Sequence, residues 1–311
     1  SMMVYNFGSA ILRAVGDTKR PLYYLSAAGV INIGLNLLFV IVFRMSVAGV
    51  ALATVISETI SASLVIRCMM KEKGSIRLTP SKLRIHPKRF AEILRIGLPA
   101  SLQGVIFAIS NVIIQSSVNS FGSTVVAGNS AASNIEGFVY VSMNSFYQGT
   151  ISFTSQNVGA GKYERVNKIL FTAQACVIVT GLVLGNLAVF FGPDLLGFYT
   201  RSAAVKAAGM NRLKIICTVY ALCGIMDVMV GSLRGLGYSV MPTIVSLIGA
   251  CGLRLLWIFT FFRIYEQFHT PQSLYLTYPV SWIITICAHV VCFVIVRRRI
   301  SRRLKTQSMA Q

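Results

Sequence analysis

The chain has 311 residues, of which 55% are apolar and only 12% are charged, and its mean hydropathy is +0.69. This composition excludes an ordinary soluble globular domain of that size. The formal net charge of +20 raises the alternative of nucleic-acid binding, so the positions of the 29 lysines and arginines decide what the charge means.

Eight apolar segments are each long enough to cross a hydrocarbon core of roughly 30 Å as a helix. In chain order they occupy residues 22–43, 47–70, 96–118, 125–157, 166–192, 214–234, 242–262 and 275–296. The fourth segment is longer than one crossing requires, so one of its ends is expected to extend beyond the bilayer. The pattern predicts an all-α, multi-pass membrane protein.

The basic residues are divided unequally between the two sides of the predicted membrane. With residues 12–21 on the cytoplasmic side, 21 basic residues lie in cytoplasmic connections and tails, six lie on the opposite side, and Arg67 and Arg254 lie within spans. Four of those six fall in one predicted outer loop: Arg201, Lys206, Arg212 and Lys214. The asymmetry follows the positive-inside rule and predicts a cell-membrane protein with a cytoplasmic C-terminus. Topology and attraction to anionic lipid account for the charge, so no nucleic-acid partner is expected.

Residues 71–94 form the longest polar connection and contain eight basic residues up to the adjoining Arg95. We predict that they are a cytoplasmic linker between two helical lobes. Residues 1–70 are then the remnant of an N-terminal transmembrane lobe, and residues 95–297 form a six-helix C-terminal lobe. Residues 298–311 are predicted to be a basic cytoplasmic tail.

A short motif occurs twice. LRAVGDTKRP at 12–21 and LRGLGYSVMP at 233–242 share Leu, Arg, Gly and Pro at an offset of 221 residues. Six predicted crossings separate the copies, so both lie on one face and the repeat is parallel. Each copy ends a span, turns at the glycine and restarts a helix near the proline. If the second lobe begins near Arg95, its counterpart would begin upstream of Ser1, so we expect that the first lobe is incomplete here.

Three of the nine acidic residues fall within predicted spans, namely Glu58, Glu136 and Asp227. A carboxylate in a span is costly, and burial favours its protonated form, so such a group is a candidate for binding and releasing a cation. Asp227 and Glu136 are the candidates for cation coupling. The alternative for Asp227 is a structural role, paired with backbone groups or with Arg254.

Glu58 is expected to be structural. It lies among the hydroxyl side chains of Thr54, Ser57 and Ser61, and Asn32 and Asn36 on the preceding span are possible partners. Nothing in the sequence places it near the other two acids.

Helical spacing gathers polar and aromatic side chains on one face of the span 125–157, which lipid would not tolerate. They are Asn129, Ser133, Glu136, Tyr140, Asn144, Tyr147 and Gln148. A second polar stripe on the span 96–118 would suit the facing wall: Gln103, Ser110, Asn111 and Gln115.

Two such helices, with Tyr220 beside Asp227 on another span, could line a substrate cavity. Tyrosine rings would accept organic cations there and amides would bind polar groups. The candidates for the cavity are Gln103, Asn111, Asn129, Tyr140, Asn144, Tyr147 and Tyr220. The alternative is hydrogen bonding between helices with no cavity. Arg254, a cation within a span, is expected to compensate a buried negative charge.

Five segments together resemble the multidrug and toxic compound extrusion (MATE) family of efflux transporters. They are NFGSAILRAVGDTKRP at 6–21, RIGLPASLQGVIFAISNVIIQ at 95–115, NIEGFVYV at 134–141, QNVGAGKYERV at 156–166 and DVMVGSLRGLGYSVMP at 227–242. The resemblance implies twelve helices in two six-helix lobes, of which this chain would hold the end of the fourth helix, the fifth, the sixth and the second lobe. It also implies export of organic, often cationic compounds in exchange for Na+ or H+ by alternating access.

The chain departs from the family pattern at two positions. By the resemblance, some branches carry acids where this sequence has Phe107 and Cys223, and others use an aspartate on a first helix that this chain lacks. The coupling ion is therefore left open between Na+ and H+, and no other cofactor is expected. The fragment alone is expected to be inactive, and the full-length protein to be a monomer that contacts membrane lipid.

Two other functions are compatible with a polytopic helical protein. A lipid-linked precursor flippase of related architecture is the first alternative, although it would need a larger, strongly basic cavity. A heptahelical receptor or membrane enzyme is the second. The sequence has no HExxH, Walker or GxSxG motif and its three histidines are scattered, so neither catalysis nor a metal site is predicted.

Overall fold

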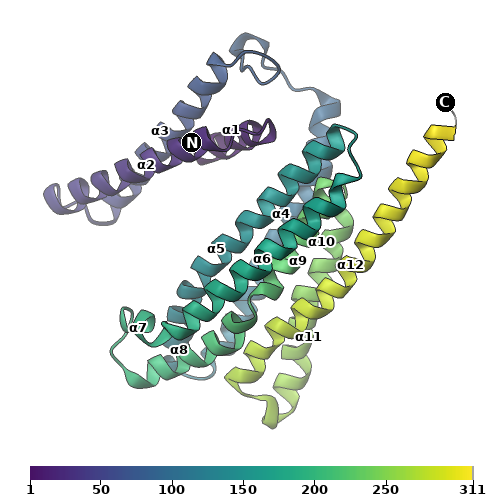
Figure 1. Ribbon diagram of the computed structural model, residues 1–311. Coiled ribbons are helices and arrows are strands. Elements are labelled where there is room, and N and C mark those ends of the chain that lie inside the picture. Colours follow the sequence, from purple (N-terminus) through teal and green to yellow (C-terminus); the bar gives the residue numbers. More distant parts are fainter. Residues whose placement is uncertain (310–311) are drawn as a thin grey trace. The chain divides into compact units, whose positions relative to one another are not determined.

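The computed structural model describes residues 1–309, which form helices joined by turns, with no strand among them (Figure 1). The all-α prediction is confirmed. Contacts divide the chain into two units, one from Ser1 to His86 and one beginning at Pro87. The boundary lies inside the predicted linker, whose last residues already belong to a helix.

In the first unit, α1 (Met2–Ala14) and α2 (Lys19–Leu37) both pack against α3 (Ser46–Lys71). The residues Leu38–Val42 extend α2 as a π-helical turn. A small apolar core forms where Leu12 meets Val65, and both side chains are fully buried.

The predicted partners of Glu58 are wrong. Asn32 Nδ2 donates to Ser57 Oγ at 3.1 Å, whereas Glu58 Oε2 accepts from the Ser1 hydroxyl at 3.3 Å. Successive helical residues point about 100° apart, so an amide that faces Ser57 does not face Glu58. Asn36 in turn donates to Asn32 at 2.9 Å.

The second unit is a helical bundle. Its helices are α4 (Pro87–Asn119), α5 (Ser123–Gly159), α6 (Arg165–Phe190), α7 (Gly192–Gly197), α8 (Ala203–Ile216), α9 (Ala221–Gly235), α10 (Val240–Ser246), α11 (Leu253–Trp257) and α12 (Pro271–Met309). The π-helical turns Leu247–Gly252 and Ile258–Phe262 flank α11, so residues 240–262 form one continuous rod.

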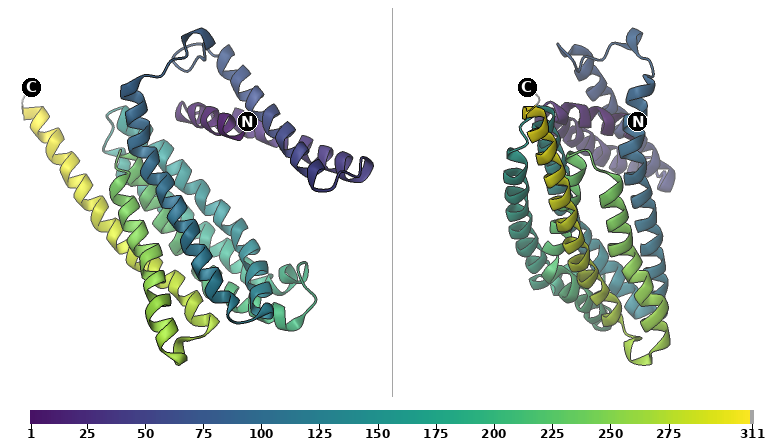
Figure 2. Two further views of the ribbon diagram at one scale, coloured as in Figure 1. Left: turned by 180° about the vertical axis from the view of Figure 1, so that it is seen from behind. Right: turned by 90° about the vertical axis from the view of Figure 1, so that its right-hand side faces the viewer.

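Helices α5 and α9 lie at the centre of this bundle. Helix α5 packs against α6, α8 and α9, and α9 also packs against α6 and α12. Helix α4 contacts α5 on one side and α10 on the other, and Figure 2 shows it running alongside them. The fully buried side chains of Met143, Val177 and Ile216 belong to the core between these helices. Apolar packing thus fixes the helices whose other faces carry the polar stripes.

Six helical segments in the described part of the chain are long and apolar enough to cross a membrane. A seventh would be the pair Ala203–Val219 and Ala221–Gly235, which is bent by 48° at a short 3-10 turn. All eight predicted spans coincide with helices, but α5 is not among the apolar ones, because its polar stripe lowers its hydropathy. The predicted span 214–234 starts too late, since its helix begins at Ala203.

The repeated motif is a helix C-cap. Gly16 and Gly237 have positive φ angles of 92° and 86°. In both copies the glycine amide bonds the carbonyl three residues earlier, at 3.0 and 2.9 Å, and the next amide bonds the carbonyl five residues earlier, at 3.0 Å. This is the Schellman arrangement, which needs a left-handed residue and so favours glycine. The local prediction of a turn at each glycine is confirmed.

Helix α6 approaches the bend between α8 and α9 through a glycine. A Cβ atom on Gly185 would lie 2.1 Å from the carbonyl oxygen of Cys217. We expect Gly185→Ala to lower the free energy of unfolding by about 1–3 kcal/mol, because the two helices must separate. Thermal unfolding in detergent measures the effect. Gly97→Ala, whose Cβ would meet nothing within 4 Å, is the control, and equal stability of the two variants would contradict the prediction.

Candidate functional site

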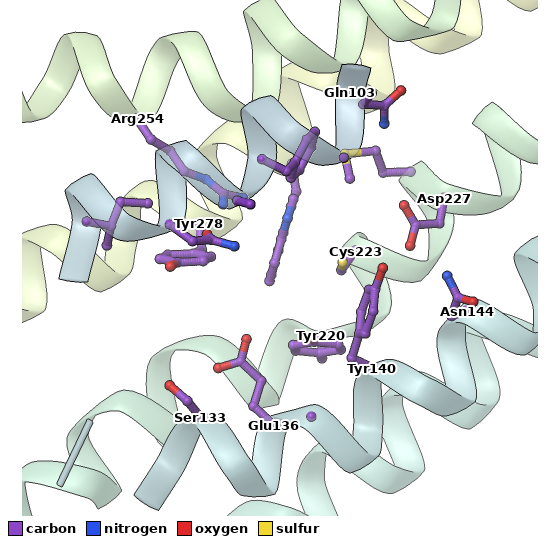
Figure 3. A pocket seen from close by; sticks show the side chains of 18 of the residues that line it. Gln103, Ser133, Glu136, Tyr140, Asn144, Tyr220, Cys223, Asp227, Arg254 and Tyr278 are labelled. Atoms are coloured by element: carbon purple, nitrogen blue, oxygen red, sulfur yellow. The ribbon is translucent and has the colours of Figure 1, made fainter. Parts of the chain in front are cut away.

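A cavity of about 680 Å³ lies inside the second unit, among α4, α5, α8, α9, α11 and α12. Its volume is in the range of small-molecule pockets. Figure 3 shows side chains from facing helices directed into it. The polar faces that lipid would reject are thereby turned to a shared interior space.

All the side chains predicted to form a site line this one cavity. They are Asp227, Glu136, Gln103, Asn111, Asn129, Tyr140, Asn144, Tyr147, Tyr220 and Arg254. The two stripes do face each other, so hydrogen bonding between helices without a cavity is not what the structure has. Phe107 and Cys223, the positions at which the family pattern carries acids in some branches, also line it.

Glu136 forms a buried ion pair with Arg212. Arg212 Nη2 and Nε lie 2.7 and 3.1 Å from Glu136 Oε2, and the two side chains are 12% (Glu136) and 7% (Arg212) exposed. The remaining guanidinium nitrogen, Nη1, donates to Asn129 Oδ1 at 2.8 Å, and Asn129 donates to Gln115 at 2.9 Å. The pair and its amides therefore tie α8 to α5 and α4.

The predicted outer-loop position of Arg212 is wrong. The residue lies in α8 and is buried, because Glu136 supplies the opposite charge that allows a guanidinium to leave water. A signal was present in the sequence, since Gly209, Leu213 and Ile216 recur near Arg212 at helical spacing and are buried.

Arg254 has aromatic neighbours instead of acidic ones. Its guanidinium carbon lies 4.1 Å from the ring centre of Tyr278 and 5.8 Å from that of Trp282. Its Nε donates to Ser281 Oγ at 2.8 Å. Among the ion pairs of the described residues, none includes Arg254. Its predicted compensation of a buried acid is therefore not a direct pairing, and Arg212 holds that place beside Glu136.

Arg234, the arginine of the repeated motif, closes part of the cavity wall. Its Nη2 donates to Gln103 Oε1 at 2.8 Å and to Thr243 Oγ1 at 3.3 Å, and its Nη1 bonds the Tyr147 hydroxyl. The repeated motif predicts a turn at this place but no role for Arg234 in the cavity. It connects α9 to α4, α5 and α10.

Of the two carboxylates that line the cavity, Asp227 is the one without a hydrogen-bonding or ion-pair partner in the described part of the chain. Within residues 1–309 its side chain makes no hydrogen bond and no ion pair, and it lines the cavity. Figure 3 shows its carboxylate on the side of the cavity toward which the hydroxyl of Tyr140 points. Neither form of the structural alternative, a pair with backbone groups or with Arg254, is present for the Asp227 side chain among the described residues.

The sequence model described as MatE matches residues 99–260, which is more than half of the chain. The chain belongs to the MATE family. The match includes α4 to α11 and so most of the cavity wall.

Individual proteins similar to this chain are also named as transporters or multidrug resistance proteins. The chain is 30% identical over 286 residues to the probable multidrug resistance protein YpnP of Bacillus subtilis, covering 91% of this chain and 62% of YpnP. It is 24% identical over 264 residues to a FAD transporter of Shewanella oneidensis, covering 82% of this chain and 56% of that protein. An outward-facing MATE family multidrug resistance transporter has the same fold, with a TM-score of 0.83 at 21% identity, over 96% of this chain and 66% of the other.

The chain thus spans less than two thirds of the length of YpnP and of the FAD transporter. Membership in the MATE family confirms the prediction of a polytopic helical membrane protein. It places the cavity in a family of membrane transporters and leaves the role of each lining residue to be argued from its contacts.

The charge of this MATE cavity differs from what cationic substrates would require. Three arginines line it, Arg212, Arg234 and Arg254, against two carboxylates, Glu136 and Asp227. With Glu136 held by Arg212, the remaining charges are two cations and one anion. The lining does not favour a cationic substrate.

Proposed function

We propose that this protein takes part in secondary active efflux of organic compounds across the cell membrane, in exchange for H+ or Na+ and by alternating access. The observation that carries the proposal is an unpaired carboxylate, Asp227, in a cavity large enough for an organic molecule. Membership in the MATE family and the likeness to a probable multidrug resistance protein support it.

Asp227 is the first candidate for the coupling residue. An antiporter needs a buried group whose charge is satisfied in turn by the coupling ion and by another state of the site. Asp227 interacts electrostatically with Arg234 but forms no ion pair or hydrogen bond among the described residues, so its carboxylate is open to a cation from solution. Glu136, the other candidate, already has its charge matched by Arg212 and so has less to gain from a cation.

The energy available is sufficient for efflux. One charge moving down 100 mV supplies about 2.3 kcal/mol, which sustains a roughly fiftyfold substrate gradient when about 1.4 kcal/mol is tenfold. The cavity side chains would bind substrate, and rocking of the lobes would present it to either side. We further propose that the C-terminus lies in the cytoplasm, which the asymmetry of basic residues supports. We also propose that the complete protein acts as a lipid-surrounded monomer and carries out no catalysis.

The other functions have less support. YpnP is named as a probable multidrug resistance protein and the Shewanella relative as a FAD transporter. These names do not favour a lipid-linked precursor flippase. A receptor or membrane enzyme would not be expected to carry this family's sequence pattern over residues 99–260.

The proposal is tested with the complete gene product in sealed membrane vesicles loaded with fluorescent dyes. The pH gradient and the sodium gradient are collapsed one at a time with selective ionophores. We expect export to stop when the gradient of the coupling ion is collapsed. Export should continue when only the gradient of the other ion is collapsed. Export that persists with both gradients collapsed would overturn the proposal of cation-coupled efflux.

A further inference from the structure

The three cavity arginines differ in how many of their donors are used. All three guanidinium nitrogens of Arg212 donate hydrogen bonds, two to Glu136 and one to Asn129. Arg234 uses both terminal nitrogens on Gln103, Tyr147 and Thr243. Arg254 forms one side-chain hydrogen bond, from Nε to Ser281, within the described residues. Arg234 keeps one buried donor, Nε, without a partner, whereas Arg254 keeps its two paired terminal nitrogens, Nη1 and Nη2, for the contents of the cavity.

Arg254 also forms no ion pair with any described residue. The residue is only 5% exposed, and its close contacts are the faces of Tyr278 and Trp282. Aromatic faces stabilise a cation partly, but they accept no hydrogen bonds in the plane of the guanidinium. A buried cation with two free donors is best stabilised by an anion with two oxygens, because the parallel N–H groups fit that geometry.

The aromatic residues around Arg254 indicate that an anion bound there would belong to an aromatic molecule. Rings from several helices line the same cavity, including those of Phe107, Tyr220, Tyr278 and Trp282. An aromatic body could pack among these rings while its anionic group reached Arg254. Asp227 lies elsewhere on the wall, so a coupling cation and an anionic substrate would not compete for one group (Figure 3).

We propose that the Nη1 and Nη2 groups of Arg254, framed by Tyr278 and Trp282, form a subsite for the carboxylate, sulfonate or phosphate of an aromatic substrate. The inference rests on the proposed function, since it names the substrate class of that cavity. It departs from the expectation of cationic substrates.

Equilibrium binding to the purified protein tests the subsite. Three probes share one ring system and differ in charge: 2-naphthoate, 2-naphthylmethanol and 2-naphthylmethylammonium. Equilibrium dialysis in a non-ionic detergent, corrected with protein-free micelles, gives the dissociation constant of each. We expect naphthoate to bind tightest. Arg254→Gln should weaken naphthoate about tenfold or more, which is about 1.4 kcal/mol, and leave naphthylmethanol within about twofold.

The control is Arg263→Gln, which removes an equal charge from an exposed arginine over the ring of Phe259, outside the cavity. It should leave the order of the three probes unchanged. Arg254→Lys keeps the charge without the paired donors and should bind naphthoate between the wild type and Arg254→Gln. It also serves where the glutamine variant does not fold.

Two results would overturn the subsite. One is a wild type that binds the ammonium probe as tightly as naphthoate, and the other is a folded Arg254→Gln variant that loses all three probes equally. Binding at equilibrium requires no ion gradient and no export. Failure of the efflux assay would therefore leave this result standing, and failure here would leave cation-coupled efflux of another substrate class possible.

Discussion

Asp227→Asn is expected to abolish the coupling of efflux to an ion gradient while leaving the protein folded. Asparagine has the shape of aspartate but no charge to be satisfied by H+ or Na+. The substrate gradient sustained at 100 mV should fall from roughly fiftyfold towards equality. Because the carboxylate has no protein partner, its loss removes no ion pair and no side-chain hydrogen bond. The unfolding temperature should stay the same or rise, since a partly buried charge that has no ion pair is lost.

The measurement is dye efflux from vesicles beside thermal unfolding of the same preparations. Asp194→Asn is the matched control, because Asp194 is exposed on α7 and does not line the cavity. Its efflux should equal that of the wild type. Wild-type efflux by Asp227→Asn would remove Asp227 from the coupling role, and loss of efflux together with loss of folding would assign it a structural role.

The fold could be predicted because its signals are strong and local. Long apolar segments predict helices at the observed places, and a glycine between a basic residue and a proline predicts the cap at Gly16 and Gly237. The shared cavity could be predicted for a similar reason. Helical spacing puts Asn129, Glu136 and Tyr140 on one face, and lipid excludes such a face, so it must turn to the interior.

The pairing inside the cavity could not be predicted, because it depends on helix rotation and on contacts far apart in sequence. Glu136 and Arg212 are separated by 76 residues. The density of charge around Arg212 is typical of a loop, so the sequence predicts a later start for this bent helix than Ala203, where it begins. Arg254 lies, as predicted, in a helical segment long and apolar enough to cross a membrane, but the sequence does not say whether an acid or a ring faces it. The partner of Glu58 could not be predicted for the same reason, since Asn32 bonds the neighbouring residue Ser57 instead.

The buried pair of Glu136 and Arg212 should dominate the stability of the cavity wall. Arg212→Met replaces the guanidinium with an unbranched apolar side chain and leaves the carboxylate of Glu136 uncompensated. We expect a loss of about 3–5 kcal/mol in the free energy of unfolding, because a buried charge is left without its partner. The double variant Arg212→Met with Glu136→Gln removes both charges and should recover most of that loss. Denaturant-induced unfolding in micelles measures the cycle.

An exposed pair supplies the control. On α4, Arg89 Nη1 lies 2.9 Å from Glu92 Oε2, and the side chains are 78% (Arg89) and 62% (Glu92) exposed. The same double-mutant cycle on Arg89 and Glu92 should give a coupling energy of less than about 1 kcal/mol in the free energy of unfolding, because water screens the charges. A double variant of the buried pair that is as unstable as Arg212→Met alone would show that the lost packing of Arg212, and not the pairing, holds the wall together.

The same cycle separates structure from coupling at Glu136. Glu136→Gln alone leaves Arg212 as an unpaired buried cation, so a loss of efflux in that variant does not distinguish a coupling role from a weakened bundle. The double variant removes this ambiguity once its stability is restored. We expect it to retain ion-coupled efflux, since Asp227 is untouched. Stable protein without efflux would instead require Glu136 to act in coupling beside Asp227, with Arg212 as the cation that the coupling ion displaces.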